Sequence, residues 1–357
     1  MAKKKRALHV GVIGLGIGRW HASNFDESRR CKLVAVCDQN ERLRTITCDK
    51  HGLPADSGYG DYRRMFADAK RTGLEAVSIA LPNKLHAPVT VAAMKAGLHV
   101  LCEKPMSTSA AGARRMIEAA KAARKTLMIN FSSRFEWESW AIKRAIEAGK
   151  IGDIYFARSI WHRRRGVPIG SQWFTTKSMS GGGPIIDLGV HRLDLAMWLM
   201  GNPKPVTVSA STFAVFGPDI AKKQGKTYDV EDLGCALIRF DNGATLILEA
   251  SWAANIQMAD EIATHLYGDK GGMVYRNLSD EPWSEAILFD ESRGGPRDTP
   301  LAKPAKATLS SFQEFVNACL DGREPIATAQ QGLDVQVILD AIYKSAATGK
   351  EVRLTTM

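Results

Sequence analysis

The chain has 357 residues, 45% hydrophobic and 24% charged, which is typical of a soluble globular protein and too long for one ordinary core. The formal net charge is +10, but the basic residues are dispersed and lack interleaved aromatic residues, so nucleic-acid binding is disfavoured. Apolar runs are too short for a membrane-spanning helix, and six cysteines without a C-x-x-C pair indicate reduced thiols in a cytoplasmic protein.

Strands and helices alternate through residues 1–129. Strands are expected at 8–13, 32–37, 76–81, 98–102 and 126–129, and helices at 18–25, 88–96 and 109–124. This alternation predicts an α/β domain with a parallel sheet and helices on both faces.

The pattern changes in residues 130–357, which we expect to form a second, α+β domain with a large, mostly antiparallel sheet. Helices are expected at 137–147, 185–200, 309–320 and 329–346, and strands at 154–161, 206–214, 233–240, 244–251 and 262–267. Asp241-Asn242-Gly243 is typical of a hairpin turn. The segment 275–307 is predicted to be rich in loops.

A glycine loop follows the first strand. Gly14, Gly16 and Gly18 form a pattern one residue shorter than G-x-G-x-x-G. Glycines at this place let the backbone approach a pyrophosphate, which the helix amino terminus then binds, although a tight turn alone would also explain them. Asp38 ends the next strand, where a carboxylate binds ribose hydroxyls and repels a 2′-phosphate, so NAD is favoured and NADP is not excluded.

Two charged residues, Glu103 and Lys104, end the strand at 98–102. Ligands of parallel sheets bind outside the carboxyl ends of the strands, so this position suits a chemically active lysine.

A second candidate pair lies in the segment that follows Gly181-Gly182-Gly183. Asp187 and His191 are four residues apart and share one face of the predicted helix. Imidazole exchanges protons near neutral pH, so His191 is a candidate general base. A structural pair and two ligands of a divalent metal are the alternatives, but further ligands are not evident nearby, so we expect no metal.

These pieces, in this order, resemble the glucose-fructose oxidoreductase/inositol dehydrogenase/MocA (Gfo/Idh/MocA) family. The resemblance covers essentially the whole chain and rests on residues 14–21, 36–38, 81–86, 97–105, 147–152, 181–191 and 345–350. It implies a Rossmann domain followed by an α+β domain whose open sheet often mediates oligomers, here a homodimer or homotetramer. The shortened glycine loop departs from the family pattern.

The resemblance also implies an NAD(P)-dependent dehydrogenase that acts on a ring carbinol of a sugar, sugar derivative or cyclitol. Lys104 would lie beside the nicotinamide and the reacting hydroxyl, Asp187 would hydrogen-bond that hydroxyl, and His191 would take its proton. Glu103 would orient Lys104. The implied cofactor-lining positions are Gly14, Gly16, Ile17, Gly18, Asp38, Pro82, Asn83, His86, Glu103 and Lys104.

Substrate contacts are expected from arginine and tryptophan side chains, which suit polyhydroxylated rings. The candidates are Arg134, Trp161, Arg163, Arg165 and Trp173, although a solvated loop or core packing would also explain them. Two other functions stay open. One is a redox-neutral NAD-dependent glycosidase on the same scaffold, and the other is a non-catalytic NAD-binding sensor.

Overall fold

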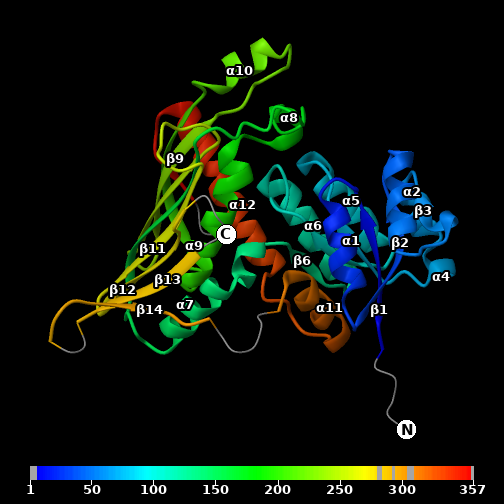
Figure 1. Cartoon of the computed structure of the whole chain (residues 1–357), viewed down its shortest axis with the longest axis horizontal. Coiled ribbons are helices and arrows are strands. Elements are labelled where there is room, and N and C mark those ends of the chain that lie inside the picture. Colours follow the sequence, from blue (N-terminus) through cyan, green and yellow to red (C-terminus); the bar gives the residue numbers. More distant parts are fainter. Residues whose placement is uncertain (1–5, 280–283, 292–293, 304–308, 355–357) are drawn as a thin grey trace, which may run out of the picture. The chain divides into compact units, whose positions relative to one another are not determined.

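The computed structural model describes residues 6–279, 284–291, 294–303 and 309–354, which fall into two compact units, each with its own sheet (Figure 1). The first unit contains the chain up to Asn130 together with Leu309–Leu333, and the second contains the remaining segments.

The first unit has a six-stranded sheet of order β3-β2-β1-β4-β5-β6 in which every strand pair is parallel. The strands are β1 (Leu8–Ile13), β2 (Cys31–Cys37), β3 (Gly58–Tyr59), β4 (Ala76–Ile79), β5 (His99–Cys102) and β6 (Leu127–Ile129). The helices are α1 (Gly18–Asp26), α2 (Glu41–Lys50), α3 (Tyr62–Ala67), α4 (Ala69–Thr72), α5 (His86–Lys95) and α6 (Ala110–Ala123). The prediction of a Rossmann-type domain is confirmed.

The central strands of this sheet position the candidate site. β1, β4 and β5 are neighbours, and their apolar residues are almost fully buried because helices cover both faces. Since the strands are parallel, the residues that follow them, including Gly14, Pro82 and Glu103, lie at the same edge of the sheet.

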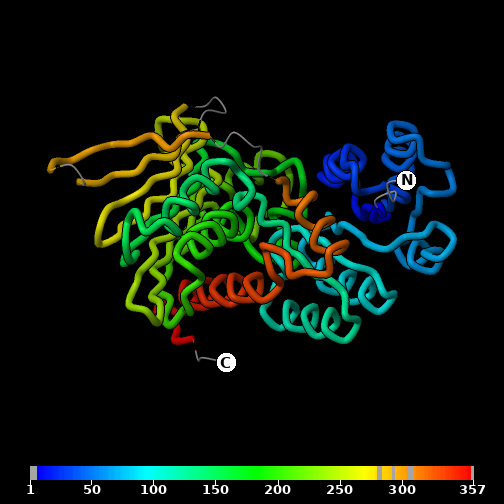
Figure 2. Tube along the Cα trace, turned by 90° about the horizontal axis from the view of Figure 1, so that it is seen from below, coloured from blue at the N-terminus to red at the C-terminus, as the bar shows by residue number. Residues whose placement is uncertain are grey.

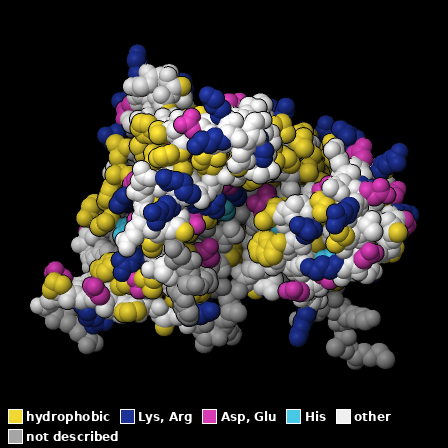
Figure 3. Space-filling view, turned by 45° about the horizontal axis from the view of Figure 1, so that its top comes forward, with side chains coloured by type: hydrophobic (Ala, Val, Ile, Leu, Met, Phe, Trp, Pro, Cys, Tyr) yellow, Lys and Arg dark blue, Asp and Glu magenta, His cyan; other side chains and the backbone are white. Residues whose placement is uncertain are grey.

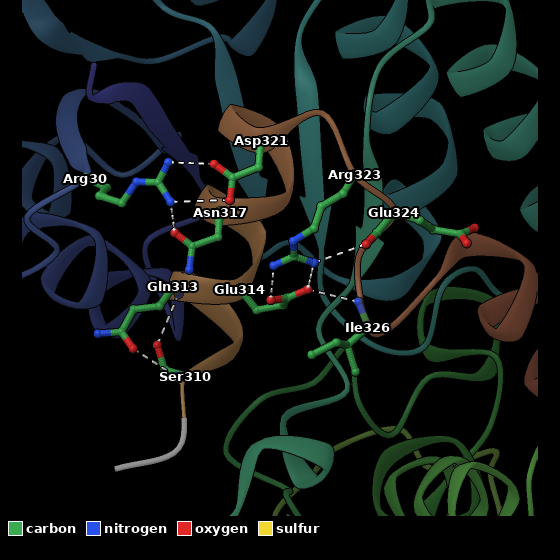
Figure 4. Close-up of polar contacts among 9 residues, drawn as sticks. All are labelled: Arg30, Ser310, Gln313, Glu314, Asn317, Asp321, Arg323, Glu324 and Ile326. Atoms are coloured by element: carbon green, nitrogen blue, oxygen red, sulfur yellow. Dashed lines mark hydrogen bonds and ion pairs between the residues drawn. The ribbon is translucent and has the colours of Figure 1, made fainter. Parts of the chain in front are cut away.

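Helix α11 (Ser311–Asp321) belongs to the first unit, although it follows the second sheet in the chain. Arg30 donates to Asn317 at 2.6 Å and pairs with Asp321 at 2.7 Å, and buried Glu314 pairs with Arg323 (Figure 4). The sequence alone groups this helix with residues 130–357, whereas the Arg30 contacts join it to the turn that precedes β2 in the first unit.

The second unit has a nine-stranded sheet of order β14-β13-β12-β11-β7-β10-β9-β8-β15, in which β7 and β10 are parallel and all other neighbours antiparallel. The predicted mostly antiparallel sheet is confirmed. The strands are β7 (Ile154–Arg163), β8 (Pro205–Phe213), β9 (Leu233–Phe240), β10 (Thr245–Ser251), β11 (Asp260–Gly268), β12 (Gly271–Asn277), β13 (Ser284–Asp290), β14 (Arg297–Pro300) and β15 (Val352–Arg353).

The loop-rich prediction for 275–307 is wrong where the structure describes that segment. β13 and β14 form a hairpin at the end of the sheet (Figure 2). Charged residues such as Arg276 and Glu285 pair across β12 and β13 and interrupt the apolar alternation from which strands are predicted. Residues 280–283, 292–293 and 304–307 of the predicted loop lie outside the described residues.

Helices pack on one face of the second sheet (Figure 1). They include α7 (Trp137–Glu147), α9 (Val190–Leu199) and α12 (Ala329–Thr348). The short helices α8 (Lys177–Ser180) and α10 (Gly217–Lys223) lie away from this face (Figure 1). The single regular helix expected at 185–200 is wrong in its first part, because Ile185–Gly189 is one π-helical turn and α9 begins only at Val190.

Candidate functional site

The three loop glycines differ in what surrounds them. Gly14 has φ +87°, and a Cβ there would lie 2.3 Å from the carbonyl oxygen of Ala80. A Cβ on Gly18 would lie 3.0 Å from Val12, so this glycine allows close packing of helix on strand. A Cβ on Gly16 would meet nothing within 4 Å, which leaves its backbone open to a ligand. A tight turn, an open backbone and close packing are the three needs of a pyrophosphate-binding loop.

The amino terminus of α1 also fits a pyrophosphate. Its N-cap residue is Ile17, which is 61% exposed and provides no side-chain cap. The first N–H groups of a helix lack intrahelical partners and carry a partial positive charge, so they bind anions. The shortened loop therefore keeps the features that NAD needs.

Asp38 ties the end of β2 to this loop. Its carboxylate accepts hydrogen bonds from Leu15 N at 2.7 Å and from Asn40 N at 2.8 Å. Nearby Arg44 donates to the carbonyl oxygens of Asp38 and Gln39 at 2.9 and 3.1 Å. Carboxylate oxygens accept more than one hydrogen bond each, so Asp38 keeps capacity for ribose hydroxyls.

Glu103 sits in a cluster of donors at the end of β5. It accepts from Asn130 Nδ2 at 2.6 Å and from the backbone N–H of Lys104 at 3.1 Å, and its Oε1 lies 3.0 Å from His21 Nε2. Burial opposes ionisation, but His21, Lys104 and Asn130 outweigh it and lower the pKa of Glu103 to about 2. Glu103 is therefore an ionised anchor for Lys104.

This lowered pKa predicts a specific acid sensitivity. An ionised Glu103 stabilises the fold above its ordinary pKa of about 4.5, and this stabilisation is lost as the pH falls toward about 2. The shift corresponds to about 3 kcal/mol. In denaturant unfolding between pH 7 and 2.5, the wild type should be more stable than Glu103→Gln. The difference between their unfolding free energies should become smaller below pH 4.5. A difference independent of pH would contradict the assignment.

His86 and Asn83, two predicted cofactor-lining residues, are buried. The ring nitrogens of His86 lie 2.7 Å from the carbonyl oxygen of Pro105 and 2.8 Å from that of Leu81. Burial lowers the pKa of His86. His86 thus links the turn after β4 with the turn after Lys104. Asn83, which is 4% exposed, directly follows Pro82 in the turn after β4.

In the second unit, a buried carboxylate holds the loop that precedes Asp187. Glu231 accepts from Gly183 N at 2.9 Å, Ile185 N at 3.2 Å and the Tyr343 hydroxyl at 2.8 Å. These contacts bind the start of the π-helical turn, a feature that often marks functional sites. Trp252, which is fully buried, donates from Nε1 to Asp187 Oδ2 at 3.0 Å. The hydrogen bond from Trp252 therefore fixes the orientation of the Asp187 carboxylate.

His191 lies beside an aromatic ring. The ring centroids of His191 and Trp161 are 5.8 Å apart, and the guanidinium of Arg163 lies 5.6 Å from the Trp161 centroid. Trp161 Nε1 and Arg163 Nε both donate to Asp260, at 2.9 and 3.2 Å. The second unit thus brings three of the predicted residues, His191, Trp161 and Arg163, close together.

Two further candidates for substrate binding have partners within the second unit. Arg165 donates to Ala254 O at 3.1 Å and to Asn255 Oδ1 at 2.9 Å, and its guanidinium lies 4.8 Å from the Phe216 centroid. Trp173 stacks on Phe174 with centroids 3.8 Å apart. Substrate contact by Arg165 and Trp173 stays a prediction.

Arg134 does not suit substrate binding, because its side chain is fully buried. It forms two contacts with buried Asp194, at 2.6 and 2.8 Å, and packs against Phe131 and Trp198. The expectation of a substrate ligand is corrected to that of a structural ion pair. The carboxylate partner of Arg134, Asp194, lies on α9, far along the chain. The residues around Arg134 therefore give no sign that its guanidinium is buried in an ion pair.

Arg134→Met should lower the unfolding free energy by about 3–5 kcal/mol, because it removes the ion-pair partner of buried Asp194. Arg158→Met is the matched control, since the Arg158 side chain is 45% exposed and its pair with Glu249 is partly solvated. That control should change stability by about 1 kcal/mol or less. If urea unfolding shows that Arg134→Met and Arg158→Met lose equal unfolding free energy, the Arg134–Asp194 pair is not a structural ion pair of the core.

Sequence reasoning missed His21, Glu231 and Trp252. Only His21 had a signal, since it lies in the recognised segment 14–21; the other two act through residues distant in the chain.

Among the described residues, the structure shows neither a group of three possible metal ligands nor a helix long and apolar enough to cross a membrane. On the face drawn in Figure 3, Lys and Arg side chains are scattered among acidic and apolar ones.

Comparison with known proteins gives concordant matches. Residues 8–131 match the oxidoreductase family model with an NAD-binding Rossmann fold, and residues 140–274 match the GFO/IDH/MocA C-terminal domain. The chain is 33% identical to D-glucoside 3-dehydrogenase of Escherichia coli, covering 97% of each chain, and 28% identical to myo-inositol 2-dehydrogenase of Thermotoga maritima, covering 97% and 98%. The solved aldose-aldose oxidoreductase of Caulobacter crescentus, complexed with glycerol, superposes with a TM-score of 0.84 at 26% identity, covering 98% and 100%.

Proposed function

This chain belongs to the GFO/IDH/MocA family of NAD-binding oxidoreductases and transfers hydride at sugar hydroxyls, and we propose that its substrate is a pyranoside or inositol oxidised at a ring hydroxyl. The observation that carries this choice is the pairing of His191 with Trp161. An aromatic face beside a proton acceptor suits a flat, polyhydroxylated ring, because the ring packs on the aromatic surface while one hydroxyl meets the base.

Three side chains are proposed to act on the reacting hydroxyl. Asp187, held by Trp252, accepts a hydrogen bond from a neighbouring hydroxyl of the substrate ring and so orients the reacting one. His191 removes its proton, and the Lys104 ammonium stabilises the negative charge that develops on the oxygen. Bound NAD supplies the hydride acceptor, and Gly16, the start of α1 and Asp38 would hold it.

The decisive experiment is a screen of glycosides, free aldoses and inositols with NAD and NADP. We expect NADH formation with a pyranoside or inositol and a ketone product at a ring carbon. Release of aglycone without net NADH would replace the proposal by the redox-neutral glycosidase. Tight NADH binding without turnover on the whole panel would replace it by the sensor.

Asp38 is proposed to select NAD over NADP. Asp38→Ser removes the charge that repels a 2′-phosphate, so the ratio of kcat/KM with NADP to that with NAD should rise by about tenfold or more. Asp49→Ser, which removes an exposed carboxylate from α2, is the matched control and should leave the ratio unchanged. An unchanged ratio in Asp38→Ser would contradict this role.

The protein is further proposed to form a homodimer or homotetramer in the cytoplasm. Ser159 Oγ contacts α9 through Arg192 O, so alternate β7 residues such as Phe156 point to the opposite sheet face. There Phe156 packs against Tyr267, which is 40% exposed, with centroids 5.3 Å apart. This face of the sheet is the proposed subunit interface, so Tyr267→Glu should shift the protein toward smaller species in sedimentation velocity. An oligomer that is unchanged from wild type would contradict this interface.

A further inference from the structure

A buried histidine on α1 connects strand β4 with the residue before Lys104. His21 has no exposed surface. Its Nδ1 lies 2.8 Å from the Ser78 hydroxyl on β4, and its Nε2 lies 3.0 Å from Glu103 Oε1. Ser78 is also fully buried and the Glu103 side chain is only 14% exposed, so these contacts are shielded from solvent.

Glu103 connects this histidine to Lys104. One carboxylate oxygen, Oε2, accepts the backbone N–H of Lys104 at 3.1 Å, while Oε1 faces His21 and Asn130. Contacts on both oxygens fix the plane of the carboxylate. Without His21, Oε1 would lose one of these two neighbours and keep Asn130, so the carboxylate could turn and release the Lys104 backbone.

The His21 ring is itself held by aromatic packing. Phe312 on α11 meets it edge to face, with centroids 4.9 Å apart and planes at 67°. Trp20 lies 5.8 Å away at 69°. A ring so enclosed keeps its Nδ1 beside the Ser78 hydroxyl and its Nε2 beside the Glu103 carboxylate, and it rotates only if these neighbours move.

We propose that His21 is a positioning residue for Lys104, acting through Glu103, an inference that rests on the proposed role of Lys104. A buried imidazole costs desolvation that an apolar side chain of similar size would avoid. The contacts with Ser78 and Glu103 offset this cost, and their consequence is a fixed carboxylate beneath the Lys104 backbone. His21 has no contact of its own with substrate in this role.

The test compares His21→Gln with His21→Leu. Glutamine retains an amide N–H that can reach Glu103, whereas leucine retains bulk without a donor. We expect kcat to fall about thirtyfold in His21→Leu and about threefold or less in His21→Gln, since small misplacements of a reacting group cost up to about a hundredfold. The KM for NAD should stay within about twofold in both, because the glycine loop is unchanged.

His51→Leu is the matched control, since His51 is a largely buried histidine of the same unit that pairs with Asp26 at 2.9 Å. It should lower thermal stability without lowering kcat. Where His21→Leu unfolds, Ser78→Ala replaces it and should lower kcat about fivefold through a freed imidazole.

Equal losses of kcat in His21→Gln and His21→Leu, or losses that follow thermal stability as in His51→Leu, would reduce His21 to a packing residue. Lys104→Ala distinguishes the proposed role of Lys104 from that of His21. An active Lys104→Ala would overturn the proposed function and this inference with it. An inactive Lys104→Ala beside a fully active His21→Leu would overturn the inference alone.

Discussion

Lys104→Ala is expected to lower kcat by about a thousandfold while the Kd for NADH changes by about threefold or less. The ammonium is proposed to stabilise charge that develops only in the transition state, so its removal acts on kcat more than on binding. The glycine loop, α1 and Asp38 hold the cofactor through other strands of the sheet, which leaves its binding largely intact. Steady-state kinetics and fluorescence titration with NADH measure the two quantities.

Lys104→Arg separates charge from proton transfer. Arginine keeps the positive charge and does not give up its proton in proteins. We expect the kcat of Lys104→Arg to be about tenfold higher than that of Lys104→Ala, because His191 is proposed to be the proton acceptor. If Lys104→Arg is as inactive as Lys104→Ala despite normal NADH binding, Lys104 moves the proton itself. Full activity in Lys104→Ala would remove it from the reaction.

His191→Ala is expected to lower kcat by about a hundredfold to a thousandfold, the usual effect of losing a general base. Added imidazole should restore part of this activity, because the small base can occupy the space left by the side chain. The KM for NAD should change little, since the predicted cofactor contacts lie on the first unit.

Asp187→Asn is the companion variant, because its side-chain oxygen can still accept from Trp252 Nε1 while the carboxylate charge is lost. A smaller loss than in His191→Ala, without rescue by imidazole, is expected. A His191→Ala enzyme that imidazole does not rescue, and that loses NADH binding in parallel with kcat, would show a structural role.

The cofactor-binding fold was predictable because its signals are local. The alternation of strands and helices in 1–129, the glycines after β1 and the carboxylate after β2 all lie within short stretches of chain. Their backbone requirements are visible in residue type, as with Gly14, whose positive φ and contact with Ala80 exclude a side chain. Lys104 is a candidate for the same reason, because with Glu103 it follows the buried strand β5, which ends at Cys102.

The second unit was predicted less completely. Its mostly antiparallel sheet was foreseen, but β13 and β14 were not, because charged pairs such as Arg276 and Glu285 replace the apolar alternation on one face. The π-helical turn before His191 was also missed. It begins at backbone N–H groups bound by Glu231, a residue that the sequence places far from Gly183.

Residue patterns in the chain were thus enough to predict the Rossmann domain and the mostly antiparallel sheet that follows it, and to propose the pyrophosphate loop and the candidates Lys104, Asp187 and His191. Folding alone decided which polar groups hold others in place: His21 and Asn130 on Glu103, Glu231 on the loop before Asp187, and Asp194 on Arg134. The physical reason is that backbone conformation depends on neighbours in the chain, whereas a buried charge depends on the partners that compensate it. Those partners are brought together by folding, from segments whose sequences carry no mark of one another.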